Sequence, residues 1–314
     1  MDLGQQNIKS ILITGANAGI GKEVARQMAL RSGVERVYLA CRNETKARAA
    51  KQELEQVTGK SCFKIILIDV SDVGSVRSAI RRLDGAVDAL VMNAGGSGGR
   101  TPLALTKDGV TQIFATNVLG HVALLEGLIA SGQLTQAAVY LGSEAARGFP
   151  QMGMKRPALP TSSVQDFVDV ITGKDFAGKK FDSALAYGEV KYTAAMWMAN
   201  QARKHPELRL ITMSPGNTQG TEIANSMALP VRIFMQYILM PFVAPMLGLA
   251  HSLEVGAGRI VAGLTDPSLK SGVFYASAEK KLTGPVVDQS EFFSDLANPS
   301  FQQHADEAIH KFFF

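Results

Sequence analysis

A tyrosine and a lysine four residues apart, Tyr187 and Lys191, are the pair in this sequence best suited to proton transfer. At positions i and i+4 of a helix, their side chains share one face. A nearby ammonium favours phenolate over phenol, so Lys191 is expected to lower the pKa of Tyr187 from its usual value of about 10. Tyr187 is then a feasible general acid or base. The same spacing also arises by chance, and an amphipathic surface pair is the competing interpretation.

A glycine-rich turn near the N-terminus predicts a phosphate site. The apolar run 11–13 leads into Thr14-Gly15-Ala16-Asn17-Ala18-Gly19-Ile20-Gly21, and residues 22–30 then have helical periodicity. A strand, a glycine turn and a helix aim a helix N-terminus and free backbone N–H groups at a phosphate. A nucleoside-triphosphate loop does not match, because Ala16 stands at its first glycine and Glu23 follows Lys22.

The end of the second predicted strand bears on the type of dinucleotide. Dinucleotide folds place an acidic residue there for the ribose of NAD, or an arginine nearby for the 2′-phosphate of NADP. Cys41 occupies the acidic position, and Arg42 and Asn43 follow it. A guanidinium suits a phosphate dianion through charge and paired hydrogen bonds, which favours NADP(H) over NAD. A solvated surface arginine is the alternative interpretation.

Two further strand ends carry candidate cofactor contacts. Asp69 and Val70 follow the third predicted strand, where a carboxylate could hydrogen-bond adenine. Asn93-Ala94-Gly95 follows the fourth, with small residues that permit close approach of a cofactor. Both strand ends fall on the ligand-binding edge of a doubly wound sheet. Ordinary turn chemistry is the alternative at either place.

Apolar runs that alternate with amphipathic stretches predict the fold. The predicted strands are 9–14, 36–40, 63–68, 87–92, 137–141, 208–213 and 272–275, and the predicted helices are 21–31, 44–57, 73–83, 107–130, 188–204 and 253–262. Near-continuous apolar strands separated by helices indicate a parallel sheet covered on both faces. The prediction is an α/β fold: a single Rossmann-type doubly wound domain over 1–314, with a mainly parallel seven-stranded sheet and helices on both faces.

Two segments interrupt this alternation. Residues 145–183 form a long, proline-rich connection with one short predicted helix at 164–171, which usually signals a functional loop or lid. Residues 219–250 include an apolar run, 233–249, that contains two prolines and is shorter than the roughly 20 residues of a membrane span. We interpret this second segment as a lid or pocket wall. A peripheral membrane contact through about 230–250 and a homo-oligomer contact are the alternatives.

Composition narrows the classes of function. The 314 residues are 46% hydrophobic and carry a net charge of +4 that is scattered along the chain, without a basic run that would predict nucleic-acid binding. Of the two cysteines, Cys41 ends a predicted buried strand, which indicates a reducing compartment. Residues 1–10 are polar, so no signal peptide is expected and a cytoplasmic location is predicted. The histidines lack ligand spacing, so no metal site is predicted.

Taken in chain order, the glycine turn, Asn93-Ala94-Gly95, Asn117, Ser143 and Tyr187-x-x-x-Lys191 resemble the short-chain dehydrogenase/reductase family. The resemblance runs from about residue 8 to 275 and includes Ser214-Pro215-Gly216 after the sixth predicted strand. Within the family, Ala40-Cys41-Arg42 and residues 116–121 look like the retinol-dehydrogenase group, with light-dependent protochlorophyllide reductases as neighbours. One departure is the separation of 44 positions (187 minus 143) between Ser143 and Tyr187, longer than in simple members.

The resemblance implies a catalytic tetrad of Asn117, Ser143, Tyr187 and Lys191. Tyr187 would exchange a proton with the substrate oxygen, Ser143 would hydrogen-bond that oxygen, and Lys191 would tune Tyr187 and bind the nicotinamide ribose. Asn117 would position a water that connects Lys191 to solvent, and Asn17 would brace the glycine turn. The implied NADP(H) contacts are Gly15, Asn17, Gly19, Ile20, Gly21, Arg42, Asn43, Asp69, Val70, Asn93, Ala94, Gly95, Tyr187, Lys191, Pro215, Gly216 and Thr218. We interpret His121 as a packed or capping histidine.

The expected function is an NADP(H)-dependent oxidoreductase that transfers a hydride between nicotinamide and the carbonyl or alcohol of a small, fairly apolar substrate. Retinoids and lipid-like or aromatic aldehydes and ketones fit this description, because the Met- and Phe-rich segment 227–249 suits an apolar ligand. The alternatives are a light-dependent protochlorophyllide-type reductase, which would need bound pigment, and a non-catalytic NADP-binding regulatory protein.

Overall fold

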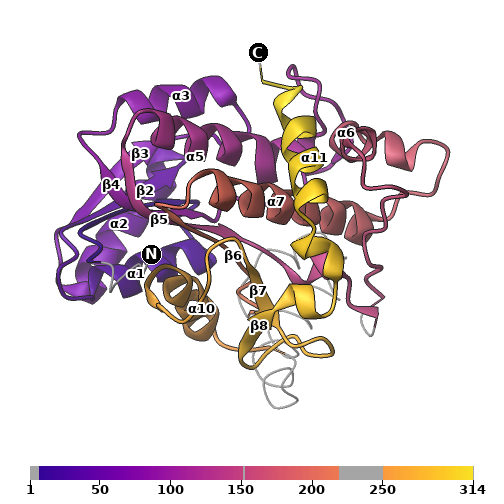
Figure 1. The fold of residues 1–314 in the computed structure, drawn as a ribbon. Coiled ribbons are helices and arrows are strands. Elements are labelled where there is room, and N and C mark those ends of the chain that lie inside the picture. The colour runs from indigo at the N-terminus through magenta and orange to yellow at the C-terminus, as the bar shows by residue number, and fades with distance from the viewer. Residues whose placement is uncertain (1–6, 151–152, 219–249, 314) are drawn as a thin grey trace, which may run out of the picture.

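The structure is a computed structural model that describes residues 7–150, 153–218 and 250–313. Its centre is an eight-stranded sheet in the order β3-β2-β1-β4-β5-β6-β7-β8 (Figure 1). The strands are β1 Ser10–Thr14, β2 Arg36–Cys41, β3 Phe63–Leu67, β4 Val87–Met92, β5 Leu134–Leu141, β6 Arg209–Met213, β7 Phe274–Ser277 and β8 Val286–Asp288. The first seven are parallel, and β8 pairs antiparallel with β7.

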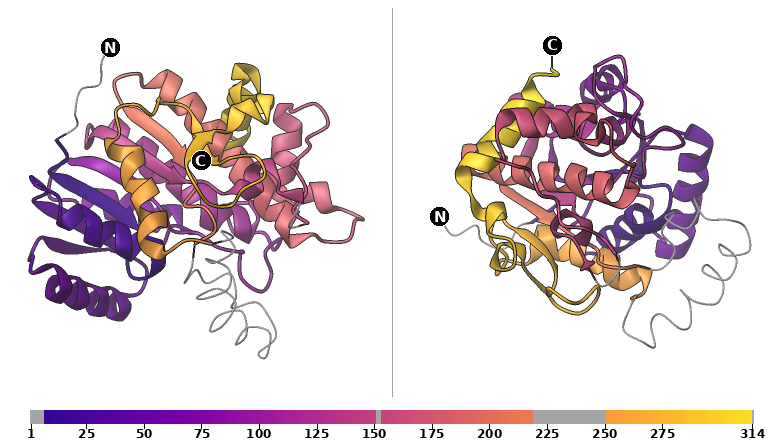
Figure 2. Two further views of the ribbon diagram at one scale, coloured as in Figure 1. Left: turned by 90° about the horizontal axis from the view of Figure 1, so that it is seen from below. Right: turned by 90° about the vertical axis from the view of Figure 1, so that its right-hand side faces the viewer.

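Helices cover both faces of this sheet (Figures 1 and 2). The α-helices are α1 Gly19–Ala29, α2 Glu44–Thr58, α3 Val73–Arg81, α4 Gln112–Phe114, α5 Gly120–Ala130, α6 Val164–Thr172, α7 Ser183–Lys204, α10 Leu253–Thr265 and α11 Pro299–His310. Shorter turns are the π-helical Ala115–Leu119 and the 3-10 segments Glu144–Arg147, Lys174–Phe176, Gln289–Glu291 and Ser294–Ala297. The predicted doubly wound α/β fold is therefore confirmed.

Alternation along the strands builds two separate apolar layers. In β1, Leu12 packs in the cluster that contains α3, α5 and α7, whereas Ile11 and Ile13 pack in the cluster with α1, α2 and α10. Successive strand residues point to opposite faces, so a sheet covered on both sides needs apolar residues at every position. This explains why the strands read as continuous apolar runs.

The strand order places the candidate site residues along one edge of the sheet. The neighbours β1, β4, β5 and β6 are parallel, so their carboxyl ends and the loops that follow them lie at the same edge. The order reverses between β1 and β4, because β1 leads outward to β2 and β4 leads to β5 on the other side. In open α/β sheets, ligands bind beside the strand ends at such a reversal.

Several element boundaries differ from the predictions. The helix predicted for 107–130 begins only at Gln112, because Gly109 has φ +76° and Leu105 forms a bridge with Thr111. The helix predicted from residue 188 begins at Ser183, where the Asp182 side chain accepts hydrogen bonds from two N–H groups of the first turn. The short strand β8 and the helix α11 were not predicted at all, and β8 brings the sheet to eight strands.

The two segments singled out by the sequence have different outcomes. Between β5 and α7 the chain packs α6 on the domain, with a capping box of Ser163 and Asp166 at its start. Phe167 of α6 is buried and stacks on Tyr192 of α7 at 6.1 Å between ring centroids. The functional-loop interpretation of residues 145–183 remains a prediction. The segment 219–250 lies outside the described residues except at Ala250.

One helical run in the described chain, Gln112–Ala130, is long and apolar enough to cross a membrane. Its mean hydropathy is 1.6 over an 18-residue window, but 72% of that window is buried inside the protein. Its residues pack against α3 and α7 in the larger apolar layer. The run is therefore accounted for as a core helix of the fold.

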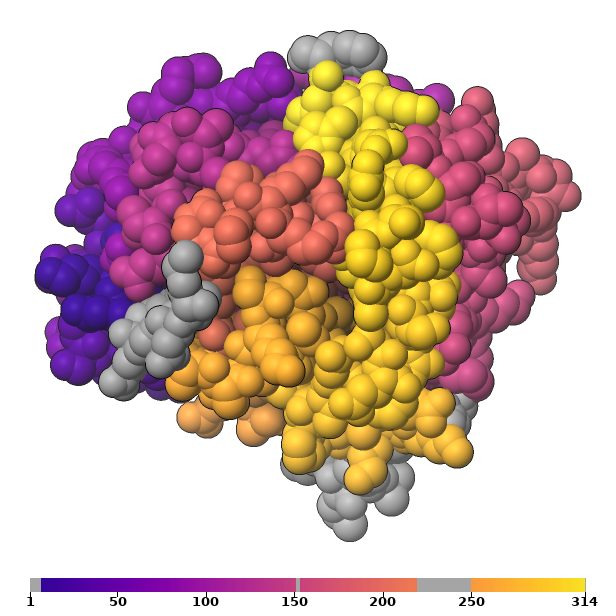
Figure 3. Space-filling view, viewed as in Figure 1, coloured from indigo at the N-terminus to yellow at the C-terminus, as the bar shows by residue number. Residues whose placement is uncertain are grey.

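The C-terminal helix α11 is bound to α5 and α7 by a polar cluster. Figure 3 shows the C-terminal chain as a ridge beside α7 on this face. His310 Nε2 lies 2.9 Å from a Glu126 carboxylate oxygen, and His310 Nδ1 lies 2.7 Å from Asp306 O. Gln201 donates to both Glu126 and Asp306. Among the described residues, Glu126, Asp306 and His310 lie close enough together to hold a metal ion. Their hydrogen bonds to one another and to Gln201 account for the arrangement.

The titration of His310 predicts how this helix responds to pH. Its hydrogen bond to Glu126 raises the pKa of His310 from 6.5 to about 9. A raised pKa means that the pairing stabilises the fold fully below pH 6.5 and is lost as the pH rises through 9. The difference in unfolding free energy between the wild type and His310→Gln should therefore be larger at pH 6 than at pH 10 in urea titrations.

His304→Gln provides the matched control, because His304 lies on the same helix and contacts the backbone carbonyl of Ser162. Its stability difference from the wild type should change much less between the two pH values. An equal difference for His310→Gln at pH 6 and pH 10 would show that the Glu126 pairing does not stabilise the fold.

Candidate active site

The glycine turn between β1 and α1 closes tightly against the loop after β4. Gly15 and Gly19 have φ of +66° and +53°, in the left-handed region that favours glycine. A Cβ on Gly21 would lie 2.5 Å from Asn93 Nδ2 and 2.6 Å from Gly15 O, so a larger residue does not fit without movement. Asn93 braces the turn, because its amide donates to Thr14 O at 2.8 Å and Gly15 O at 3.3 Å. From the sequence, the bracing role was expected of Asn17, and Asn93 was expected only as a cofactor contact.

Helix α1 leaves its first N–H groups without a side-chain cap. Its N-cap residue is Ala18, which has no acceptor to offer. In contrast, the side chains of Asn43, Asp72, Ser163, Asp182, Ser252 and Asn298 cap α2, α3, α6, α7, α10 and α11, respectively. Uncapped donors at a helix N-terminus bind anions well, because the helix dipole adds positive potential there. The tight glycine cradle and the uncapped helix together fit the pyrophosphate of a dinucleotide.

Thr14 joins the glycine turn to the neighbouring strand end. Its hydroxyl oxygen accepts from the N–H groups of Asn93 at 2.9 Å and Ala94 at 3.0 Å. The same hydroxyl lies 3.1 Å from His121 Nε2. His121 is 1% exposed, and burial lowers its pKa to about 4, so its ring is neutral near pH 7. This agrees with the interpretation of His121 as a packed histidine.

Asn117 lies inside a π-helical turn, where helices often carry functional residues. Its side-chain amide donates to Gly96 O at 2.8 Å and Ile113 O at 2.7 Å, and its carbonyl accepts from Gly96 N at 3.2 Å. A Cβ on Gly95 would lie 2.6 Å from Asn117 Oδ1. The small residues after β4 are therefore required by Asn117 itself, in addition to any approach of a cofactor.

Ser143, Tyr187 and Lys191 come together from β5 and α7. Ser143 lies two residues after the end of β5, and its side chain is close enough to Tyr187 to affect the pKa of that phenol. Lys191 Nζ lies 5.6 Å from the centroid of the Tyr187 ring and donates to Leu141 O at 2.8 Å. Lys191 is 3% exposed, whereas Ser143 and Tyr187 are partly exposed. The structure therefore places two partly exposed hydroxyl side chains next to a buried ammonium.

Burial controls the protonation of this group. It raises the pKa of Tyr187 to about 12, with a further contribution from the Glu144 carboxylate, while the Ser143 hydrogen bond acts in the opposite direction. Burial also lowers the pKa of Lys191 to about 7. The expectation that the pKa of Tyr187 is lowered is therefore wrong for this structure, because desolvation of the phenol is the largest effect and raises its pKa. Near pH 7 Tyr187 keeps its proton, which suits a proton donor.

Comparisons with known proteins agree with this geometry. The family model described as short chain dehydrogenase matches residues 9–147. Mouse retinol dehydrogenase 12 is 32% identical over 202 residues, which cover 62% of this chain and 56% of that protein. Bovine retinol dehydrogenase 12 is 37% identical over 133 residues, covering 41% of this chain and 40% of that protein. The matches thus span about half the length of these relatives.

These matches show that the chain is similar to the short-chain dehydrogenase/reductase family, most clearly over residues 9–147. Among solved structures, salutaridine reductase from Papaver somniferum aligns with a TM-score of 0.62 at 19% identity, over 85% of this chain and 99% of that chain. NADPH-bound carbonyl reductase from chicken fatty liver aligns with a TM-score of 0.56 at 19% identity, over 89% of this chain and 100% of that chain. At such identity these two structures establish the fold alone.

Glu144 is a residue next to the site that the sequence did not point to. It follows Ser143, is 5% exposed, and accepts from Ser214 Oγ at 2.6 Å and from Ser277 N at 3.2 Å. Its carboxylate therefore ties the loops and strands at the ends of β5, β6 and β7 together. Burial lowers the pKa values of the Arg147 and Arg259 guanidinium groups, and the nearby Glu144 charge partly opposes this shift.

The residues expected near the adenosine half follow β2 and β3. Arg42 is 76% exposed, and its guanidinium lies 3.7 Å from Asp69 Oδ2. Asp69 Oδ1 accepts from the N–H and hydroxyl of Ser71, so half of this carboxylate stabilises a turn. The Asn43 side chain caps α2. Val70 is buried, and its carbonyl lies where a side chain on Gly120 would be.

The segment after β6 forms a second tight turn at the same edge. Gly216 has φ +72°, and its N–H donates to Ser214 Oγ at 3.0 Å. Thr218 donates to Pro215 O at 3.0 Å and Gly216 O at 3.2 Å. A Cβ on Gly216 would lie 2.4 Å from Arg259 and 2.6 Å from His251. Arg259 and His251 therefore pack closely against this turn.

Every predicted site residue lies at or directly after the carboxyl end of a strand, in α1, or on α7 and the π-helical turn. The structure thus gathers the residues of the glycine turn, Asn93-Ala94-Gly95, Asn117, Ser143, Tyr187 and Lys191 at one edge of the sheet. Arg42, Asn43, Asp69 and Val70 stand apart from this group, after β2 and β3.

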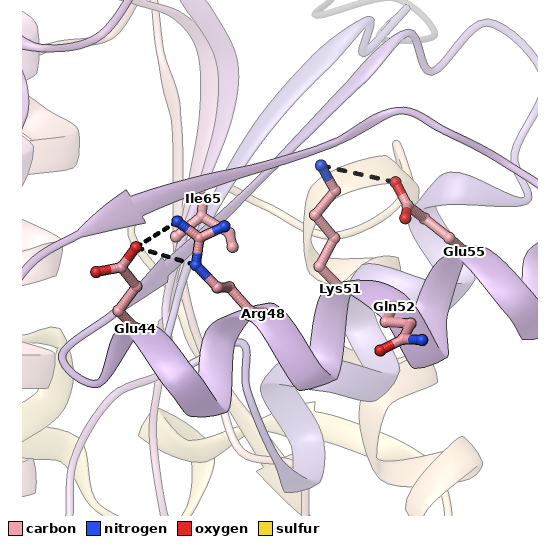
Figure 4. Close-up of a pocket in the computed structure, with 6 residues that line it drawn as sticks. All are labelled: Glu44, Arg48, Lys51, Gln52, Glu55 and Ile65. Carbon is pink, nitrogen blue, oxygen red and sulfur yellow. Dashed lines mark hydrogen bonds and ion pairs between the residues drawn. The ribbon is translucent and has the colours of Figure 1, made fainter.

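A surface hollow lies away from this group, between α2 and the edge strand β3. It has a volume of about 440 Å³ and is lined by Glu44, Arg48, Lys51, Gln52, Glu55 and Ile65 (Figure 4). Ion pairs one helical turn apart, Glu44 with Arg48 and Lys51 with Glu55, run along it. Their side chains are exposed, so this hollow is a solvated helix face.

The glycine turn predicts a steric effect on stability. Gly21→Ala should lower the unfolding free energy by about 1–3 kcal/mol, because the added methyl group overpacks Asn93 and Gly15. Gly258→Ala in α10 is the matched control, since the nearest atom to its Cβ would be 3.8 Å away. This control should be neutral or stabilising by up to about 1 kcal/mol, as expected for a helix interior. Urea unfolding of both variants checks the prediction; equal stabilities would contradict it.

Proposed function

We propose that this chain is an NADP(H)-dependent oxidoreductase that transfers a hydride between the nicotinamide and a carbonyl or alcohol group of a small apolar substrate. The observation that carries the proposal is the placement of the Ser143 and Tyr187 hydroxyl groups close together, with the buried Lys191 next to the Tyr187 ring. This arrangement supplies a proton donor and an oxygen-binding hydroxyl at one place. NADP(H), when bound, supplies the hydride.

Residues of the chain carry out the proton transfer and stabilise the charge on the substrate oxygen. Tyr187, whose pKa of about 12 keeps it protonated at neutral pH, donates a proton to the oxygen of a carbonyl substrate during reduction. Ser143 donates a hydrogen bond to the same oxygen and stabilises its developing charge. Lys191 and Asn117 hold Tyr187 and Ser143 in place next to the reacting atoms. In the oxidation of an alcohol, the same residues act in reverse.

The residues present fit a nicotinamide dinucleotide. The uncapped start of α1 and the glycine turn suit its pyrophosphate, with Gly15, Gly19, Ile20 and Gly21 lining the approach. Asn93, Ala94 and Gly95 follow β4 next to the turn, and Pro215, Gly216 and Thr218 follow β6 on the other side. We assign the residues after β4 to the phosphates and ribose, and the residues after β6 to the nicotinamide carboxamide.

Arg42 supports the choice of NADP(H) over NAD. It follows β2, its charge is available at the surface, and Cys41 before it offers no carboxylate for a ribose hydroxyl. The related carbonyl reductase and the L-sorbose reductase from Gluconobacter frateurii were both solved with NADPH. Asp69 beside Arg42 would contact adenine through the oxygen that Ser71 does not occupy.

The substrate class rests on relatives and composition. Retinol dehydrogenases are the named relatives with the higher identities, which supports an apolar alcohol or aldehyde such as a retinoid. The apolar segment 219–250 is proposed to form part of the pocket wall or a peripheral membrane contact of a cytoplasmic protein.

Removing the Tyr187 hydroxyl tests the chemistry. Tyr187→Phe should lower kcat for NADPH oxidation with an aldehyde substrate by about 10²–10⁴-fold, because the proton donor is lost. NADPH affinity, measured by the quenching or enhancement of its fluorescence, should stay within a few-fold. Tyr192→Phe is the matched control on the same helix, since Tyr192 stacks in the core between Phe167 and Phe293. Turnover by Tyr187→Phe at the wild-type rate would rule out this assignment.

Replacing Arg42 tests the cofactor preference. Arg42→Ala should weaken NADPH binding by roughly 10-fold or more and leave NADH binding nearly unchanged. The reason is that only NADPH carries the 2′-phosphate to which the Arg42 guanidinium would donate charged hydrogen bonds. Arg48→Ala, another exposed arginine on the adjoining helix, is the matched control. Fluorescence titration with both cofactors provides the measurement. An equal loss for NADPH and NADH would remove the phosphate-binding role of Arg42.

A further inference from the structure

Tyr140 is a second tyrosine in the site, and nothing in the sequence motifs pointed to it. It lies in β5, three residues before Ser143, and its side chain is 0% exposed. It packs on the sheet face that carries α5 and α7, in the same layer as Tyr187. A buried phenol needs a hydrogen-bond partner, so the contacts of its hydroxyl indicate what it does.

The hydrogen-bond directions at the Tyr140 hydroxyl follow from its partners. The hydroxyl lies 2.9 Å from Asn117 O and 3.2 Å from Lys191 Nζ. A carbonyl only accepts and an ammonium only donates, so Tyr140 donates its single proton to Asn117 and accepts from Lys191. The hydroxyl therefore joins two members of the predicted tetrad directly. The sequence analysis expected a water next to Asn117 in this connection.

The Lys191 ammonium is fixed at two of its three N–H groups. One donates to the Tyr140 hydroxyl and another to Leu141 O at 2.8 Å, so both bonds lead to β5. The nitrogen also lies 4.7 Å from the centroid of the Tyr140 ring and 5.6 Å from that of Tyr187, within the range of cation–π attraction. Because the three N–H groups are tetrahedral, fixing two of them fixes the direction of the third.

We propose that Tyr140 is a positioning residue of this site: its hydroxyl clamps the Lys191 ammonium to the Asn117 carbonyl and thereby aims the remaining Lys191 N–H. The inference deepens the proposed function and rests on it for its catalytic consequence. Tyr140 acts through Lys191 and does not itself contact the reacting atoms. It is not a proton relay, since its own proton is held by an amide carbonyl that cannot pass a proton on.

The clamp extends to the glycine turn. Asn117 O also accepts from His121 Nδ1 at 2.9 Å, and His121 Nε2 lies 3.1 Å from the Thr14 hydroxyl. The Tyr140 and His121 rings meet edge to face at 5.9 Å. The titratable groups around Lys191 are thus Tyr140, Tyr187 and the neutral His121, and one continuous chain of hydrogen bonds connects the ammonium with the end of β1.

The variant Tyr140→Phe removes the hydroxyl and keeps the ring. Losing a hydrogen bond to a charged group costs enough that kcat/KM for aldehyde reduction should fall roughly 10-fold or more. Tyr275→Phe is the matched control, because Tyr275 also lies in a strand of the sheet, on β7, and the hydrogen bond of its hydroxyl is accepted from Lys270 N. This control should retain kcat/KM within about twofold, as expected for a change outside the site.

A measurement without cofactor or substrate tests the clamp itself. In protein labelled with ¹³C at lysine Cε, the Lys191 resonance is identified by its loss in Lys191→Met. The Tyr140 hydroxyl favours the charged ammonium, so the titration midpoint of Lys191 should move to lower pH in Tyr140→Phe and stay unchanged in Tyr275→Phe. A midpoint and kcat/KM that both match the wild type would overturn the proposal.

A stability cycle covers the case in which Tyr140→Phe folds poorly. Leaving a buried donor unpaired is costly, whereas removing both partners is nearly neutral. The destabilisation by Tyr140→Phe should therefore be much smaller in the Lys191→Met background, and equal destabilisation in both backgrounds would overturn the clamp. If the wild type oxidises no NADPH with any carbonyl substrate, the proposed function fails, while the titration and the cycle still decide whether Tyr140 clamps Lys191.

Discussion

The site depends on keeping a lysine charge out of water. Lys191 is almost fully buried, and its hydrogen-bond partners are neutral oxygens of Tyr140 and Leu141. Burial without a carboxylate partner lowers the pKa of Lys191 to about 7, so the fold bears the cost of an ammonium that is only partly charged at neutral pH. Such costs are characteristic of functional sites, because a purely structural position would carry an apolar side chain.

The sheet topology makes that placement possible. Lys191 and Tyr187 lie on α7, which crosses behind β5, and the ends of β1, β4, β5 and β6 meet at one edge. Two polar bridges fix these ends: the hydroxyl of Thr14 between β1 and the loop after β4, and the carboxylate of Glu144 across the ends of β6 and β7. The Glu144 charge also helps to keep Tyr187 protonated. The same bridge therefore supports both geometry and chemistry.

Local patterns predicted the parts of the molecule that local interactions determine. The sequence predicted the apolar strands, the glycine turn and the Tyr187–Lys191 spacing, because each depends on residues that are close together in the chain. Tyr140, Glu144 and the bracing by Asn93 were not predicted, since their roles come from contacts between distant segments. The pKa of Tyr187 was predicted in the wrong direction because burial is a tertiary property. Helix α11 is different: Asn298 followed by Pro299 is a start signal that the sequence analysis overlooked.

The central claim is that this site delivers a hydride and a proton to a carbonyl group. The most direct test is to incubate the purified protein with NADPH deuterated at C4 of the nicotinamide and an apolar aldehyde, and to analyse the alcohol by mass spectrometry. Separate reactions with deuterium on each face of the ring cover both stereochemical outcomes. The account predicts one deuterium on the carbinol carbon of the product with one of the two labelled cofactors. NADPH that binds while no labelled alcohol forms with any aldehyde or ketone supplied would contradict it.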